Sequence, residues 1–121
     1  TKGKGVPVVY DGVGKDTWEA SLDCLAPRGM MVSFGNASGA VTSINPGILA
    51  AKGSLFLTRP TLFHYVASRD ELLAAARDLF SVVKSKKVKI SVNQSYALRD
   101  AAQAHADLEA RKTTGSTVLI P

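Results

Sequence analysis

Residues 6–14 read Val-Pro-Val-Val-Tyr-Asp-Gly-Val-Gly. The first five are almost wholly apolar and mostly β-branched, which is typical of a strand that is covered on both faces. The Asp-Gly-Val-Gly that follows breaks the strand. Because fully covered strands belong in parallel sheets, this stretch predicts an α/β fold.

The pattern of strand followed by helix repeats along the first half of the chain. Apolar runs that suit buried strands alternate with helical spacing and with capping residues. The predicted order is β-α-β-α-β, in a mostly parallel sheet with flanking helices. The expected elements are a strand at residues 6–10, a helix with Trp18, Leu22 and Leu25 facing inward and ending at residues 27–29, a strand at residues 30–34, a short helix from Asn45-Pro46 to Ala51 and a strand at residues 54–57.

The second half continues with two helices and two strands. Ser68 and Glu71 have the spacing of a capping box, so a helix should begin there. Val88, Ile90 and Val92 alternate with polar residues and predict a strand with one polar face. A final helix should carry Leu98 to Leu108, with Arg111 in its last turn, before a strand at residues 117–120.

Composition is that of one soluble globular unit over residues 1–121, with 45% hydrophobic and 21% charged side chains. No apolar run approaches the roughly 20 residues that cross a bilayer, and Thr1–Val6 has no hydrophobic signal core. The single cysteine, Cys24, cannot form an internal disulfide. We therefore expect a cytoplasmic protein with no membrane partner.

The formal net charge of +5 favours polyanions, among them nucleic acids and phosphorylated cofactors. A nucleic-acid stripe could run through Lys84, Lys86, Lys87 and Lys89, but stacking aromatics and nucleic-acid recognition motifs are missing around them. We interpret these lysines as solvated and expect no nucleic-acid partner. The nucleic-acid alternative would require salt-sensitive binding through these four lysines.

Ligands of open α/β sheets bind beyond the carboxyl ends of the strands, here the loops after Tyr10, Phe34 and Leu57. The loop at residues 35–39 reads Gly-Asn-Ala-Ser-Gly, so a ligand could approach its backbone. The G-x-G-x-x-G fingerprint of a dinucleotide pyrophosphate site is absent, because Gly3-Lys4-Gly5 precedes a strand instead of following one. The first half of such a binding fold is therefore not expected in these residues.

Blocks of sequence along the whole chain resemble the C-terminal part of the zinc-free quinone oxidoreductases. These enzymes form a branch of the medium-chain dehydrogenase/reductase superfamily, and the bacterial NADPH:quinone reductases are the most similar. The resemblance is carried by residues 8–14, 17–19, 21–22, 28–39, 53–60, 69–80, 98–111 and 115–121.

The resemblance implies an enzyme that transfers hydride from NADPH to a quinone, with no metal required. Residues 1–85 would be the second half of a Rossmann-like NADPH domain, and residues 86–121 a return segment toward the catalytic domain. As a fragment of such an enzyme, this chain alone should be inactive. A non-enzymatic nucleotide-binding or dimerisation module is the competing hypothesis.

The resemblance also implies particular site residues. Gly12 and Val13 would lie along the cofactor, Phe34, Gly35 and Asn36 would approach its nicotinamide end, and Arg111 would contact it. Asn36 can offer a donor and an acceptor to a carboxamide, and Arg111 a planar fork to a phosphate. A homodimer is expected through the strand at Ser54–Leu57.

Two further residues could suggest chemistry but are interpreted as packing. His105 shares an apolar helical face with Leu98 and Leu108, so it is predicted to be a core histidine and not a base. Cys24 stands between two leucines with no basic neighbour, so it is predicted to be buried and unreactive. No residue of the chain is thus assigned a catalytic role.

Overall fold

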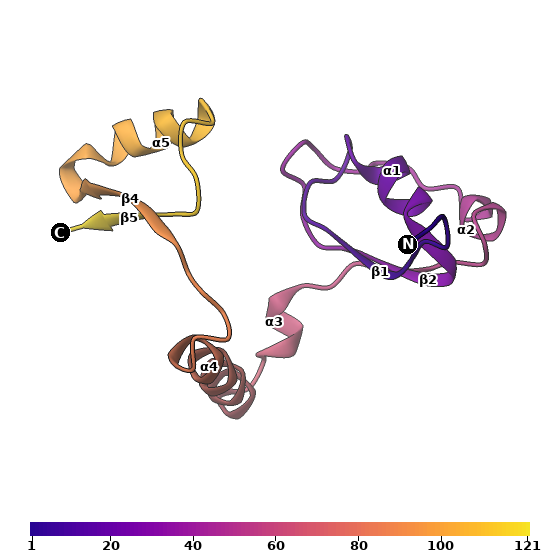
Figure 1. Ribbon diagram of the computed structural model, residues 1–121, viewed down its shortest axis with the longest axis horizontal. Coiled ribbons are helices and arrows are strands. Elements are labelled where there is room, and N and C mark those ends of the chain that lie inside the picture. Colours follow the sequence, from indigo (N-terminus) through magenta and orange to yellow (C-terminus); the bar gives the residue numbers. More distant parts are fainter. The chain divides into compact units, whose positions relative to one another are not determined.

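The computed structural model describes all residues, Thr1–Pro121 (Figure 1). It divides into two compact units, Thr1–Ala67 and Ser68–Pro121, each of which has its own sheet. The sequence instead suggested a single unit with a division after residue 85, and the identity of residues 86–121 as a return segment stays a prediction. The units are described separately below.

The first unit is built on a three-stranded parallel sheet in the order β1-β2-β3. In the register, Asp11 lies opposite Ser33, and Val32 lies opposite Thr58, so the carboxyl ends of the strands meet at one edge. The predicted α/β fold with mostly parallel strands is confirmed. The elements are β1 (Val6–Asp11), α1 (Trp18–Asp23), β2 (Leu25–Ser33), α2 (Gly47–Ala51), β3 (Phe56–Thr58) and α3 (Leu62–Tyr65).

The core of this unit lies between one face of the sheet and the helices α1 and α2. Leu22 from α1 and Met31 from β2 are fully buried at its centre. The opposite face is not covered within the unit, since Tyr10 is 74% exposed and Phe56 58%. Cover on both faces was predicted, but the unit supplies it on one face only. The cluster comprises Trp18, Leu22, Leu25, Met31 and Leu55, with Val9, Val41, Ile48, Leu49 and Leu57 packed against it.

The first helix is shorter than predicted. It ends at Asp23, and Leu25 is already part of β2, where it lies opposite Val6. The amide of Val6 donates to the carbonyl of Cys24 at 2.9 Å, so strand pairing takes over directly after the helix. Residues 27–29, predicted as the end of the helix, instead belong to an irregularity in the strand, because Val8 pairs next with Met30.

The second unit opens with the helix α4 (Arg69–Lys84). The predicted capping box is confirmed: the Glu71 amide donates to the Ser68 hydroxyl, and the Glu71 carboxylate accepts from the Ser68 amide. The apolar stripe of this helix is exposed, with Leu79 at 54% and Phe80 at 68%. The helix is therefore stabilised within this chain by its capping box and not by burial of its apolar stripe.

A strand-helix-strand element completes the second unit. It consists of β4 (Val92–Ala97), a short 3₁₀ turn η1 (Leu98–Asp100), α5 (Ala101–Glu109) and β5 (Ser116–Ile120), with β4 parallel to β5. The strand predicted through Val88 and Ile90 is wrong, because pairing with β5 begins only at Val92, opposite Ser116. The predicted final strand is confirmed.

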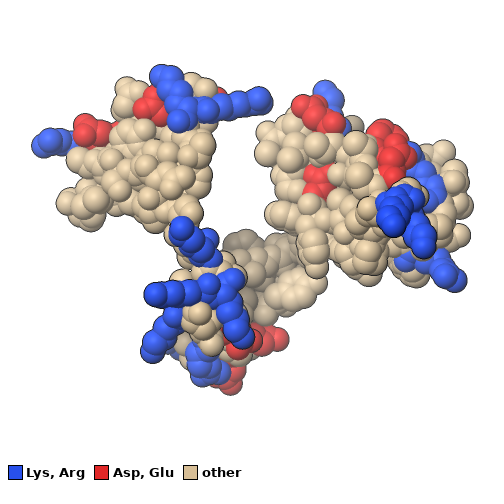
Figure 2. Space-filling model, in the orientation of Figure 1, with Lys and Arg blue, Asp and Glu red and all other residues tan.

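Two predicted core residues are exposed. Cys24 and His105 both lie on the surface of their units, so their interpretation as buried packing residues is wrong. The apolar face of α1 is covered, but Cys24 follows the last residue of that helix and lies outside the core. The apolar face of α5 is itself open, since Leu98 is 54% and Leu108 57% exposed. The four lysines at positions 84–89 are exposed, as predicted, and Figure 2 shows basic side chains around α4 mixed with acidic ones.

None of the helices is both long enough and apolar enough to cross a membrane.

We predict that Leu22→Ala destabilises the protein by about 2–5 kcal/mol, because it leaves a cavity beside Met31 in the centre of the core. Chemical denaturation followed by the fluorescence of Trp18, which belongs to the same cluster, measures this loss. Glu19→Ala on the same helix is the control, since its surface ion pair with Lys52 should contribute at most about 1 kcal/mol. Equal effects of the two substitutions would contradict this core.

Candidate functional site

The loops that follow β1 and β2 run side by side at the carboxyl edge of the sheet. The amide of Phe34 donates to the carbonyl of Asp11 at 2.9 Å, and the amide of Ser38 donates to the carbonyl of Val13 at 2.8 Å. The ladder between the two strands therefore continues into their loops. Five predicted site residues are brought together in this way: Gly12, Val13, Phe34, Gly35 and Asn36.

Glycine is required where the loops touch. A Cβ on Gly35 would overlap the Gly12 carbonyl, and a Cβ on Gly12 would lie 3.1 Å from the Phe34 ring. Phe34 is 54% exposed and Val13 40% exposed, so an apolar surface flanks the glycines. The two loops thus meet backbone to backbone, and the exposed side chains of Phe34 and Val13 give the edge of the sheet an apolar surface.

A buried carboxylate, that of Asp11, holds the first loop in place. It is 4% exposed and accepts hydrogen bonds from the amides of Val13 and Gly14 and from the hydroxyls of Thr17 and Ser21. Burial raises its pKa, but the four donors outweigh burial and lower the pKa from 3.8 to about 2. Asp11 is therefore ionised at neutral pH and joins β1, the loop and α1.

Ser38 links the two loops through its side chain. Its hydroxyl donates to the Val13 carbonyl at 2.9 Å and accepts from the Asp16 amide at 3.0 Å. Neither Ser38 nor Asp11 was singled out from the sequence. An aspartate directly before Gly-x-Gly, with hydroxyl residues six and ten positions later, was the available signal for Asp11.

Arg59 ties the end of β3 to the second loop. Its guanidinium donates to the carbonyl of Ser33 at 2.8 Å and to that of Gly35 at 3.3 Å. A cleft of about 880 Å³ lies beside it, lined by aromatic and apolar side chains that include Tyr10, Phe34 and Tyr65. Asn36 and Arg59 also line a smaller cavity of about 220 Å³.

Arg111, the remaining predicted site residue, belongs to the second unit. The sequence placed it in the last turn of the final helix, but α5 ends at Glu109 and Arg111 follows the C-cap residue Ala110. Its φ of 57° is left-handed, a conformation that costs a non-glycine residue about 1 kcal/mol. Its side chain is exposed.

Residues 1–119 match the family described as zinc-binding dehydrogenase. This chain belongs to that family.

Curated relatives within the family cover the whole chain. It is 60% identical to the quinone oxidoreductase of Pseudomonas aeruginosa over 121 residues, and 58% identical to quinone oxidoreductase 1 of Escherichia coli over 123 residues. A 2-haloacrylate reductase from a Burkholderia species is 48% identical. The predicted resemblance to quinone oxidoreductases is confirmed. The chain spans 37% of the Pseudomonas protein and 38% of the Escherichia coli one.

Solved structures agree with these relatives. Escherichia coli quinone oxidoreductase complexed with NADPH aligns with a TM-score of 0.91 and 57% identity, over 99% of this chain and 37% of that one. A mycobacterial protein complexed with NADPH aligns with a TM-score of 0.93 and 49% identity, over the same shares. The Rossmann-like character of the fold is therefore confirmed.

The name of the zinc-binding dehydrogenase family raises the question of a metal site. No three His, Cys, Asp or Glu side chains of this chain gather where they could hold a metal ion. The side chains of these residues therefore do not form a zinc site. The exposed apolar side chains of Phe34 and Val13 at the sheet edge do fit a planar cofactor ring.

We predict that Asp11→Asn lowers the free energy of unfolding by roughly 1–3 kcal/mol at neutral pH, because buried donors lose their charged acceptor. The carboxylate stabilises the fold fully above its ordinary pKa of 3.8, and this contribution is lost as the pH falls toward about 2. Urea denaturation at neutral and acidic pH measures both effects.

The matched control is Asp16→Asn, which changes an exposed carboxylate of the same loop. It should leave the stability and its dependence on acidic pH close to those of the unsubstituted protein. A stability profile for Asp11→Asn that parallels the unsubstituted one down to acidic pH would show that the Asp11 charge does not support the loop.

Proposed function

We propose that this chain is the C-terminal portion of an oxidoreductase that transfers hydride from NADPH to a quinone, without zinc and in the cytoplasm. In this proposal residues 1–85 are the second half of the NADPH domain and residues 86–121 return toward the catalytic domain. The observation that carries it is the meeting of Gly12, Val13, Phe34, Gly35 and Asn36 at the carboxyl edge of a parallel sheet. The names of the relatives supply the reaction.

NADPH, when bound, supplies the hydride, and the residues of this chain bind and orient it. Gly12 and Gly35 let the two loops pack backbone to backbone, and this contact fixes the edge of the sheet against which the nicotinamide ring would lie. Phe34 and Val13 provide apolar surface beside it, and the side chain of Asn36 makes no hydrogen bond within the chain, which leaves its amide available to a carboxamide. In the second unit, Arg111 presents an exposed guanidinium to a phosphate of the cofactor.

The first loop is unsuited to hold the diphosphate. The amides of Val13 and Gly14 point inward to the Asp11 carboxylate, so they are not available to an anion. Phosphate contacts must come from elsewhere, which is why we propose that residues 1–121 alone bind NADPH very weakly and do not turn over a quinone.

A test uses the full-length enzyme that contains this chain, with NADPH oxidation by a quinone followed by absorbance. We predict that Asn36→Leu lowers kcat by roughly 10-fold or more with a smaller change in KM, because a misplaced ring loses donor-acceptor alignment. Thr42→Leu, in an exposed part of the following loop, is the control and should keep the original rates.

Three results would contradict parts of the proposal. An enzyme that binds NADPH without reducing quinones would favour the non-enzymatic nucleotide-binding module. Unchanged kinetics for Asn36→Leu would remove that residue from the nicotinamide site. Measurable turnover by residues 1–121 alone would show that the phosphate-binding portion is not needed.

We also propose that the enzyme is a homodimer joined through the strand at Ser54–Leu57. β3 pairs only with β2 within the chain, so its other edge carries unpaired backbone groups that a second copy could complete. Phe56 on this strand is 58% exposed.

We predict that Phe56→Lys shifts the enzyme from dimer toward monomer, because a lysine on an edge strand opposes strand pairing. Sedimentation equilibrium over a range of protein concentrations measures the shift. Thr42→Lys adds the same charge away from this strand and should leave the oligomeric state unchanged. A dimer of equal affinity in both variants would place the interface elsewhere.

A further inference from the structure

The turn after α5 is a Schellman motif with an arginine where glycine is usual. The amide of Arg111 donates to the carbonyl of Leu108, and the amide of Lys112 donates to that of Asp107, both at 3.0 Å. Arg111 holds the left-handed position between them. Gly115, four residues later, also has a left-handed φ, and there a Cβ would collide with the Ser91 carbonyl.

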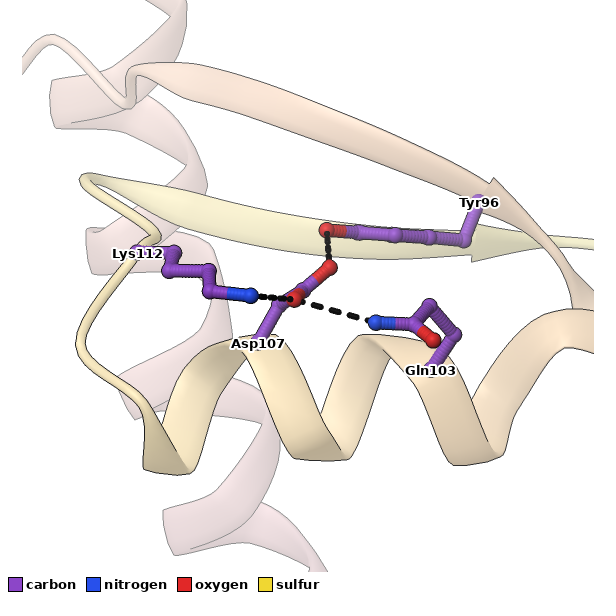
Figure 3. Close-up of polar contacts among 4 residues, drawn as sticks. All are labelled: Tyr96, Gln103, Asp107 and Lys112. Atoms are coloured by element: carbon purple, nitrogen blue, oxygen red, sulfur yellow. Dashed lines mark hydrogen bonds and ion pairs between the residues drawn. The ribbon is translucent and has the colours of Figure 1, made fainter.

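An ion pair replaces the apolar contact that usually closes this motif. The two residues joined by the outer hydrogen bond, Asp107 and Lys112, are also joined through their side chains, with the Lys112 ammonium 3.2 Å from the Asp107 carboxylate (Figure 3). Asp107 and Lys112 are thus joined both by a backbone hydrogen bond and by a side-chain ion pair. Arg111 lies in the turn between these two residues.

Asp107 is in turn fixed to its surroundings. The hydroxyl of Tyr96, on β4, donates to one carboxylate oxygen at 3.0 Å, and the Gln103 amide donates to the other at 3.0 Å (Figure 3). The Gln103, Lys112 and Tyr96 donors hold the pKa of Asp107 below its ordinary value. The Asp107 side chain is 18% exposed, whereas that of Lys112 is 68% exposed. The carboxylate therefore connects the sheet, the helix and the turn.

A strained backbone conformation persists where several surrounding contacts hold it in place, and such conformations are common at ligand sites. The turn at the end of α4 can be compared with the turn at Arg111. Lys86 occupies the same left-handed position and its amide donates to Val83, but no side-chain ion pair closes that turn. A left-handed backbone therefore occurs at both turns. The turn at Arg111 differs because the Asp107–Lys112 ion pair holds it.

We propose that Asp107, held by Tyr96 and paired with Lys112, is a positioning residue that fixes the turn in which Arg111 meets a phosphate group of the cofactor. This inference rests on the proposed function. Asp107 does not touch the cofactor in this proposal, and it acts only through the direction in which Arg111 projects. Arg111 keeps a costly backbone conformation because its guanidinium is needed at that point.

The first experiment separates the arginine side chain from its backbone strain in the full-length enzyme. Arg111→Gly should leave the melting temperature equal or higher, since glycine suits the left-handed position, and should raise the Kd for NADPH by roughly 10-fold, with kcat changed much less. Lys86→Gly relieves the same strain at the end of α4 and should leave the Kd unchanged. Fluorescence titration with NADPH measures both.

The second experiment tests the positioning role by a double-mutant cycle. Asp107→Asn should raise the Kd for NADPH by roughly 3- to 10-fold and speed hydrogen exchange of the Lys112 amide in the cofactor-free enzyme. Combined with Arg111→Ala, it should add no further loss of affinity to that of Arg111→Ala alone. Lys112→Arg should retain the ion pair and the original Kd, whereas Lys112→Gln should behave like Asp107→Asn.

The outcomes separate this inference from the proposed function. If Arg111→Ala weakens NADPH binding but Asp107→Asn does not, or if the two losses add fully, the positioning role is wrong and the proposed function stands. If Arg111→Ala leaves the Kd unchanged, both the role of Arg111 and its positioning are wrong. An enzyme without affinity for NADPH would overturn the proposed function and this inference together.

Discussion

The direct contact between Gly12 and Gly35 sets the geometry of the whole carboxyl edge of the sheet. Parallel pairing brings Asp11 opposite Ser33, and the Asp11 carbonyl then accepts from the amides of both Phe34 and Gly35. The chains are so close at this point that a side chain on Gly35 would collide with the Gly12 backbone. The close approach of the two loops beyond the strands therefore requires glycine at position 35.

The buried charge beneath this contact determines what the loop can bind. Asp11 is ionised, and it draws the amides of Val13 and Gly14 inward, where a phosphate-binding turn would point its amides outward. An anion placed at this loop would meet a carboxylate without free amides to offset it. In the proposed function, this loop would therefore lie along the uncharged end of the dinucleotide, and the phosphate contacts would come from other residues.

Features that depend on neighbouring residues were predictable from the sequence. The capping box of Ser68 and Glu71 is one, since its partners are three residues apart. The order of strands and helices is another, because each element carries its own periodicity. Family resemblance, rather than periodicity, supplied Arg111 as a site residue. The same resemblance supplied Gly12 and Gly35, which lie in loops that the strand pattern had already marked as places for a ligand; their role in binding stays a prediction.

What could not be predicted depends on contacts between distant residues. The early end of α1 follows from pairing of Leu25 with Val6, and β4 begins at Val92 because that is where β5 becomes available. Ser38 reaches Val13 across 25 positions, and no local pattern marks such a link. The exposure of His105 was missed because an apolar pattern shows which face of a helix requires burial, not whether another element buries it. The exposure of Cys24 was missed because the helix ends before it, so its two leucine neighbours do not define its own orientation.

The uncovered apolar faces give a physical reason to expect no activity from these residues alone. Tyr10 and Phe56 on the sheet and Leu79 and Phe80 on α4 are all more than half exposed, although each belongs to a regular apolar pattern. Faces of this kind are typical of surfaces that another polypeptide segment covers. Without that cover, the sheet that holds Gly12 and Gly35 is supported from one side only. Hydride transfer demands closely fixed distances, so a site on a sheet supported in this way would lose its alignment even before the missing phosphate contacts are considered.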